Sequence, residues 1–200
     1  MIKKRIKRTV RISRYVFYRE TLIDQKAHLW AFLGSFVGIG IIGLIQEFSL
    51  STQDSIFLIG SFGASSVLVY GITQSPFSQP RNLIGGHVIS ALAGVTVHKL
   101  FPELLWIAAP LAVSLSIVLM QITKTLHPPG GATALIAVAG TEKVKALGYL
   151  YVLSPVLTGC LVLFITALVF NNMEKKHSYP ARRLRLPVRL RKQAGSGGKR

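Results

Sequence analysis

The residues of this chain best suited to chemistry cluster at one break in its hydrophobic sequence. The segment 126–135 reads LHPPGGATAL and places a histidine, two prolines and two glycines between strongly apolar runs. Proline lacks an N–H and glycine weakens helix interiors, so one continuous membrane helix is unfavourable here. Inside lipid, such a break is tolerated only where the freed backbone groups meet protein or water. The segment therefore predicts a cavity at membrane depth, with the titratable side chain of His127 beside it.

The polar residues near this break and near a second glycine-rich segment favour a small anion. The four acids between residues 28 and 170 all fall in predicted loops, whereas cation carriers commonly rely on buried acids. Short helices beginning near Gly63 and Gly131 would present free N–H groups and a partial positive charge, and glycine lets an ion approach the backbone closely. The residues expected to bind the anion are Gly63, Ser65, Ser66, Arg81, Asn82, His87, His127, Gly130, Gly131 and Thr133.

Several of these residues have a structural alternative. Histidine titrates near neutral pH, so His127 could pass a proton as an anion crosses, or it could simply cap the break by bonding a carbonyl. For His87, which follows two glycines, the functional and structural roles are equally open. Arg81 offers a fork of donors suited to oxyanions and could attract an anion, or it could anchor the cytoplasmic interface. We expect Lys124 to extend to the interface.

The charges divide the chain into a hydrophobic block and two basic tails. Half of the residues are hydrophobic and the mean hydropathy is +0.46, yet the net charge is +17. Of the 24 Lys and Arg, nine lie in residues 1–27 and ten after residue 170. Such residues stay on the cytoplasmic side, which predicts two cytoplasmic termini. We expect a basic N-terminal segment (1–27), a transmembrane domain (28–170) and a flexible basic tail (171–200), with the tails contacting anionic lipid headgroups rather than nucleic acid.

The elements expected to position the site are all α-helical. About 20 apolar residues are needed to cross a bilayer as a helix, and four runs qualify, while two glycine-rich segments are short. The four long spans are expected at 30–45, 83–97, 104–122 and 147–170, the last broken at Ser154-Pro155, and the short segments at 56–72 and 131–140. Either the short segments dip in and out, giving four crossings, or they cross, giving six; we slightly favour six.

An internal resemblance predicts two structural repeats. Residues 63–69 read GASSVLV and residues 131–137 read GATALIA, an offset of 68. Each repeat would be a long helix, a short glycine-rich helix and another long helix. If all three elements cross, the repeats have opposite orientation, and paired interrupted segments in corresponding positions point to a transport site. For a single such segment, close packing of small residues would be sufficient explanation.

Enzymatic chemistry is not expected. The sequence contains no Gly-x-Ser-x-Gly elbow, no His-Glu-x-x-His and no visible nucleophile–base pair. The single Cys160 cannot form an intrachain disulfide, and no Cys/His cluster predicts zinc. We therefore expect no metal and no cofactor.

Three motifs in order resemble the HPP family of integral membrane proteins. They are residues 63–66 (GASS), 75–87 (SPFSQPRNLIGGH) and 126–135 (LHPPGGATAL), and the likeness covers about residues 28–170. The resemblance implies four transmembrane helices and transport of nitrite, a small monovalent oxyanion. Some relatives carry a C-terminal nucleotide-binding CBS domain, and no such regulation is expected here.

The prediction from sequence is thus an inner-membrane transporter of nitrite or a similar small anion, with proton linkage left open. Its small size predicts a homo-oligomer. The alternatives are a passive anion channel built from the same residues, and a membrane scaffold that works through its lipid-binding basic tails.

Overall fold

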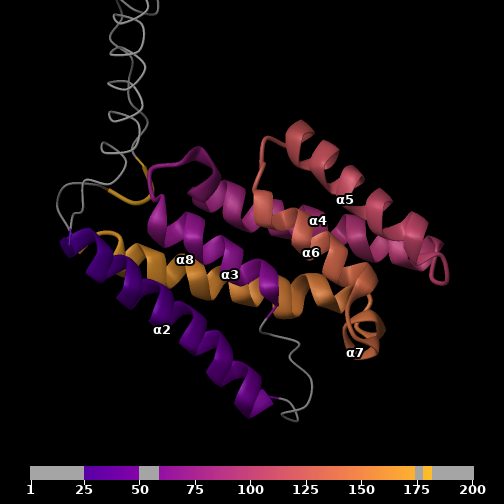
Figure 1. The fold of residues 1–200 in the computed structure, drawn as a ribbon, viewed down its shortest axis with the longest axis horizontal. Helices are drawn as coiled ribbons and strands as arrows, with labels where there is room; N and C mark the ends of the chain where they lie inside the picture. The colour runs from indigo at the N-terminus through magenta and orange to yellow at the C-terminus, as the bar shows by residue number, and fades with distance from the viewer. Residues whose placement is uncertain (1–24, 50–58, 174–177, 182–200) are drawn as a thin grey trace, which may run out of the picture.

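The computed structural model describes residues 25–49, 59–173 and 178–181, which form helices, turns and short irregular connections, without strands. Figure 1 shows the helices as one bundle with their axes roughly along its long direction. In chain order the elements are α2 (Gln25–Ser49), α3 (Gly60–Ser66), η1 (Val67–Gly71), η2 (Pro76–Ser78), α4 (Pro80–Leu100), α5 (Leu105–Ile122), α6 (Pro128–Ala139), α7 (Glu142–Ala146), η3 (Val152–Leu157) and α8 (Thr158–Phe170).

Four helical segments are long and apolar enough to cross a membrane. They are Gln25–Phe48, Pro80–Leu100, Leu105–Ile122 and Val152–Phe170, whereas α6 has only 12 residues. The prediction of four long helices and two short ones is confirmed. The first helix is longer than predicted, and Glu47, placed in a loop by the sequence analysis, lies exposed in its last turn.

The long run at the C-terminal end is interrupted as expected. Ser154 has non-helical dihedrals of φ −140° and ψ 121° directly before Pro155. Proline disfavours the helical region for the residue before it, which accounts for the position of the break.

Successive helices alternate in direction (Figure 1). The ring centroids of Trp30, near the start of α2, and Phe170, at the end of α8, are 6.4 Å apart, so both lie at one end of the bundle. At the opposite end, the Lys99 ammonium near the end of α4 lies 5.7 Å from the centroid of Tyr149. Since α2 and α4 run in the same direction, the chain must return between them, and α3 with η1 runs back. α6 makes the corresponding return between α5 and α8.

The two halves therefore have opposite orientation. α2, α3 and α4 form one triplet, and α5, α6 and α8 form the other. The short helices start at equivalent positions, because Gly63 is the fourth residue of α3 and Gly131 the fourth residue of α6. This arrangement agrees with the predicted duplication and with an inverted repeat.

Close backbone approach holds α4 against α6. A Cβ atom on Gly94 would lie 2.5 Å from the Ala134 carbonyl oxygen, and one on Gly86 would lie 2.5 Å from the His127 Cβ. Small residues let neighbouring membrane helices approach in this way. α4 thereby carries His87 into the middle of the bundle, where its side chain is fully buried.

A short C-terminal segment packs against the same end of the bundle as the start of α4. Tyr179 is only 3% exposed, and its hydroxyl donates to the Ser78 carbonyl at 2.8 Å. The Ala181 N–H donates to the Gln79 side-chain oxygen at 2.8 Å. Residues 178–181, assigned by the sequence analysis to a flexible tail, are thus part of the packed structure, while 1–24 and 182–200 lie outside the described residues.

Candidate functional site

The segment before α6 places His127 at the start of that helix. His127 is the N-cap, with extended dihedrals of φ −140° and ψ 104°, and Pro128 opens the helix, as its fixed φ favours. The Asn82 side-chain amide of α4 donates to the Leu126 carbonyl at 2.7 Å. This contact ties the segment that precedes His127 to the start of α4.

Both nitrogens of His127 have partners. Nδ1 lies 2.8 Å from the Phe77 carbonyl oxygen, and Nε2 lies 2.9 Å from the Ser65 hydroxyl. The bond from Nδ1 to the Phe77 carbonyl is the structural role considered for this residue. The contact of Nε2 with Ser65 joins His127 to α3, the short helix of the first repeat.

His87 is held between the two short helices. Its Nε2 lies 2.7 Å from Ser65 Oγ on α3, and its Nδ1 lies 2.6 Å from Thr133 Oγ1 on α6. Its ring centroid is 4.8 Å from that of His127 and 5.6 Å from that of Phe62, which meets it edge-on. The two imidazoles thus share one hydroxyl, that of Ser65.

Further hydroxyl and carbonyl contacts extend this set. Ser65 Oγ donates to the Ser61 carbonyl at 2.9 Å, and Thr133 Oγ1 donates to Ser61 Oγ at 2.9 Å. The Tyr151 hydroxyl donates to the Thr133 carbonyl at 3.2 Å. We call the five linked side chains the histidine network; its members are Ser61, Ser65, His87, His127 and Thr133.

The histidine network is buried and contains no acid. Each of its five side chains is at most 1% exposed. The described carboxylates, Glu47, Glu103 and Glu142, are all exposed. Burying a positive charge without a partner is costly, so the site suits neutral imidazoles or an imidazolium accompanied by an anion.

Arg81 and Asn82 do not contact the histidine network. The Arg81 guanidinium is exposed and donates to the Thr123 carbonyl at 2.7 Å, which joins the start of α4 to the end of α5. Asn82 bonds the carbonyl of Leu126, the residue before His127. Both residues position the break that carries His127.

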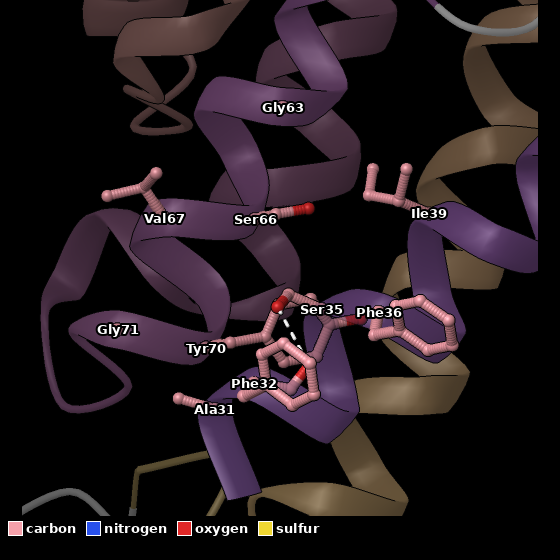
Figure 2. A pocket seen from close by; sticks show the side chains of 10 residues that line it. All are labelled: Ala31, Phe32, Ser35, Phe36, Ile39, Gly63, Ser66, Val67, Tyr70 and Gly71. Carbon is pink, nitrogen blue, oxygen red and sulfur yellow. Dashed lines mark hydrogen bonds between the residues drawn. The ribbon is translucent and has the colours of Figure 1, made fainter. Parts of the chain in front are cut away.

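Gly63 and Ser66 face a different part of the bundle. They line an open groove of about 520 Å³ between α2 and α3, next to Ile39 and Tyr70 (Figure 2). The Ser66 hydroxyl is buried there without a hydrogen-bond partner. The network and this groove thus lie on different sides of α3, because consecutive helix residues point about 100° apart.

The equivalent glycine of the second repeat also lines a groove. Gly131 borders an apolar groove of about 590 Å³ between α5 and α6, which includes Leu126 and Pro128 on either side of His127. Gly130 instead packs inward, since a Cβ there would lie 2.7 Å from Ser90 Oγ.

The second short helix begins earlier than expected, which changes the hydrogen-bond donors available at its start. α6 begins at Pro128 rather than near Gly131, and its first two residues, both prolines, have no N–H. The Gly130 N–H is bonded to the His127 carbonyl at 2.8 Å. The donors of the described site are therefore imidazole and hydroxyl groups rather than backbone N–H groups at Gly131.

Three partners were missed from the sequence. Ser61, the Phe77 carbonyl and Tyr151 all bond to members of the network or to their backbone. Ser61 lies four residues before Ser65, on the same helix face, so its helical spacing was an available signal. A backbone carbonyl carries no sequence signal of its own.

Ser65 and His87 form a serine–histidine contact that the sequence did not reveal, with 2.7 Å between Oγ and Nε2. The Ser65 hydroxyl has three polar neighbours within 2.9 Å and is 0% exposed. Among the described residues no group of three His, Cys, Asp or Glu side chains is placed to hold a metal ion.

A bundle of apolar helices around a buried polar network defines a polytopic helical membrane protein. The chain belongs to the HPP family: residues 20–180 match the family described as HPP, transmembrane region. The resemblance drawn from the three motifs is confirmed.

Two proteins of Dictyostelium discoideum, each named only as a transmembrane protein, are similar to this chain. One is 47% identical over 165 residues, covering 81% of this chain and 58% of the relative. The other is 44% identical over 154 residues, covering 76% of this chain and 49% of the relative. The chain therefore spans about half the length of these curated relatives. No solved structure matches it.

Proposed function

We propose that this protein transports a small monovalent oxyanion, with nitrite as the first substrate to test. The observation that carries the proposal is the histidine network, which joins the two oppositely oriented short helices at the centre of the bundle. Substrate sites of many membrane transporters lie where such repeats meet. A site with imidazole and hydroxyl donors and no carboxylate is suited to an anion rather than a cation.

Burial favours a carrier over an open channel. His87 and His127 are both 0% exposed, so an anion reaches them only after the helices around them move. Such a carrier saturates with substrate and supports counterflow, whereas a passive channel does not exchange one labelled anion for another against its gradient. A non-transport scaffold acting through its tails would instead be insensitive to changes at His127.

The ends of the helical domain lie at one face, as the contact of Trp30 with Phe170 indicates, and we assign that face to the cytoplasm of an inner membrane. The basic tails would contact anionic headgroups there. Large apolar side chains such as Phe36 and Trp106 are exposed, which is compatible with lipid contact and with a homo-oligomer. We assign the protein no cofactor, metal or enzymatic activity.

The test is nitrite uptake into liposomes that contain the purified protein, with and without an inward proton gradient. Protein-free vesicles measure the leak of neutral nitrous acid. We expect uptake above that leak in the wild type and its loss in His127→Ala. Ser116→Ala is the matched control, because Ser116 is equally buried but bonds only the Val113 carbonyl. Equal uptake by wild type and His127→Ala would reject His127 as part of the pathway.

A further inference from the structure

The hydrogen bonds of the histidine network determine where the imidazole protons lie. The Phe77 carbonyl can only accept, so His127 carries a proton on Nδ1. The Thr133 hydroxyl gives its single proton to Ser61 Oγ, so it must accept from His87 Nδ1. Both imidazoles are therefore protonated on Nδ1, and when both are neutral both Nε2 atoms are acceptors.

These two acceptors face the same oxygen. His87 Nε2 and His127 Nε2 lie 2.7 and 2.9 Å from Ser65 Oγ, which has one proton. The Ser61 carbonyl, 2.9 Å away, competes for that proton as well. With both imidazoles neutral, at least one nitrogen faces the Ser65 oxygen without a hydrogen between them. A buried acceptor left without a donor is unfavourable.

One additional proton satisfies both nitrogens. If His127 Nε2 is protonated, it donates to Ser65, and Ser65 donates to His87 Nε2. When the His127 Nε2–H bond breaks and its proton passes to Ser65, the Ser65 O–H bond breaks and that proton passes to His87. The positive charge has then moved from one imidazole to the other, and Ser65 is again a neutral hydroxyl.

The surroundings offer this charge no partner. The described ionisable groups on the elements around the pair include no acid. They are hydroxyls and a thiol (Tyr70 on η1, Tyr151 before η3 and Cys160 on α8), and Arg81, His98 and Lys99 near the two ends of α4. α5 and α6 carry no ionisable side chain. A buried imidazolium in this setting requires an anion beside it.

We propose that the His87–Ser65–His127 triad binds one proton together with each monovalent anion, so that the protein carries both in an electroneutral one-to-one step. This inference rests on the proposed function and adds the co-substrate and its stoichiometry. Ser65 is the positioning and relay residue, since it is the group that bonds both imidazoles.

The first experiment measures binding rather than transport. The heat of nitrite binding to the purified wild-type protein is compared in two buffers that differ in ionisation enthalpy, which yields the protons taken up per anion. We expect about one proton per nitrite. Binding of nitrite without proton uptake would overturn the inference while leaving anion transport intact. Failure to bind and failure of uptake together would reject the proposed function itself.

The second experiment tests electroneutral transport, and it distinguishes loss of proton transfer through Ser65 from loss of folding. Uptake into liposomes is measured with the membrane potential clamped at zero or negative inside, and we expect no change in initial rate. A rate that falls when the interior is negative would reject electroneutrality. Ser65→Ala should lower proton-linked uptake about tenfold, whereas Ser65→Thr, which keeps a hydroxyl, should retain most of it. Ser116→Ala controls for the loss of a buried hydroxyl. If Ser65→Ala keeps wild-type proton uptake on binding, the relay role of Ser65 is refuted.

Discussion

Ser65 and Thr133 occupy equivalent positions in the two short helices, 68 residues apart, and hydrogen-bond to opposite nitrogens of His87. One hydroxyl is 2.7 Å from Nε2 and the other is 2.6 Å from Nδ1. Each repeat thus contributes one hydroxyl to a single imidazole, so His87 couples the two halves of the bundle directly. In the proposed carrier, a relative shift of α3 and α6 would therefore change the bonding of His87 at the central site.

Replacing Thr133 by valine should weaken the network without changing its volume much. The variant leaves His87 Nδ1 without its partner inside the bundle, which costs about 1–3 kcal/mol. Thermal unfolding of the detergent-purified protein should therefore shift to lower temperature, and nitrite uptake should fall. Thr96→Val is the control, since Thr96 is half-buried and bonds the Leu92 carbonyl of its own helix and the Tyr149 hydroxyl, not the histidine network. Equal destabilisation by both variants would contradict a special role for Thr133.

Adding a methyl group should distinguish the inward-facing glycines from the groove-facing ones. A Cβ at position 86 would lie 2.5 Å from His127 Cβ and 2.8 Å from the Thr125 carbonyl oxygen. Gly86→Ala should therefore destabilise by about 1–3 kcal/mol and lower uptake, because the segment before His127 must move.

Gly63→Ala should be tolerated, since a Cβ there meets nothing within 4 Å. Removing glycine from a helix interior contributes about 0.5–1 kcal/mol of stability. The same variant tests the sequence-based expectation that an anion approaches the backbone at Gly63. Wild-type uptake with raised thermal stability would reject that expectation; strongly reduced uptake by a stable variant would support it.

Arg81 should act on structure and on local charge, not as a direct ligand. Its guanidinium is exposed and bonds the Thr123 carbonyl. Arg81→Lys should therefore keep most uptake, while Arg81→Gln should lower it more at low than at high salt, because screening weakens an exposed charge. A loss of uptake with Arg81→Lys as complete as with His127→Ala would show instead that the guanidinium binds the anion.

The C-terminal segment should stabilise the turn whose Phe77 carbonyl accepts a hydrogen bond from His127. Tyr179 bonds the carbonyl of Ser78, the residue after Phe77. Tyr179→Phe should lower stability by about 1 kcal/mol, as expected for one lost hydrogen bond. Tyr149→Phe serves as the control because that ring is 48% exposed and its hydroxyl makes an exposed bond to Thr96. A Tyr179→Phe variant that unfolds at the wild-type temperature would show that the Tyr179 hydroxyl contributes nothing measurable.

Features encoded by local sequence were predictable. The long apolar runs, the breaks at His127-Pro128 and Ser154-Pro155, and the 68-residue repeat each depend on residues adjacent in the chain, and each appears in the structure. The prediction of an acid-free interior also holds for the described residues, because it follows from the positions of the few acids outside the apolar runs.

Which polar residues meet depends on tertiary packing. Ser65 and Ser66 are neighbours with the same chemistry, yet one bonds two histidines and the other faces the groove beside α2. Arg81 and Asn82 precede His87 by one or two helical turns, yet they bond the ends of other elements. Local sequence was sufficient to predict a helical membrane domain with a duplicated, interrupted design. The rotation of each short helix and the close approach of α4 to α6 placed His87, Ser65 and His127 together, because the direction of a side chain depends on long-range packing that no local pattern records.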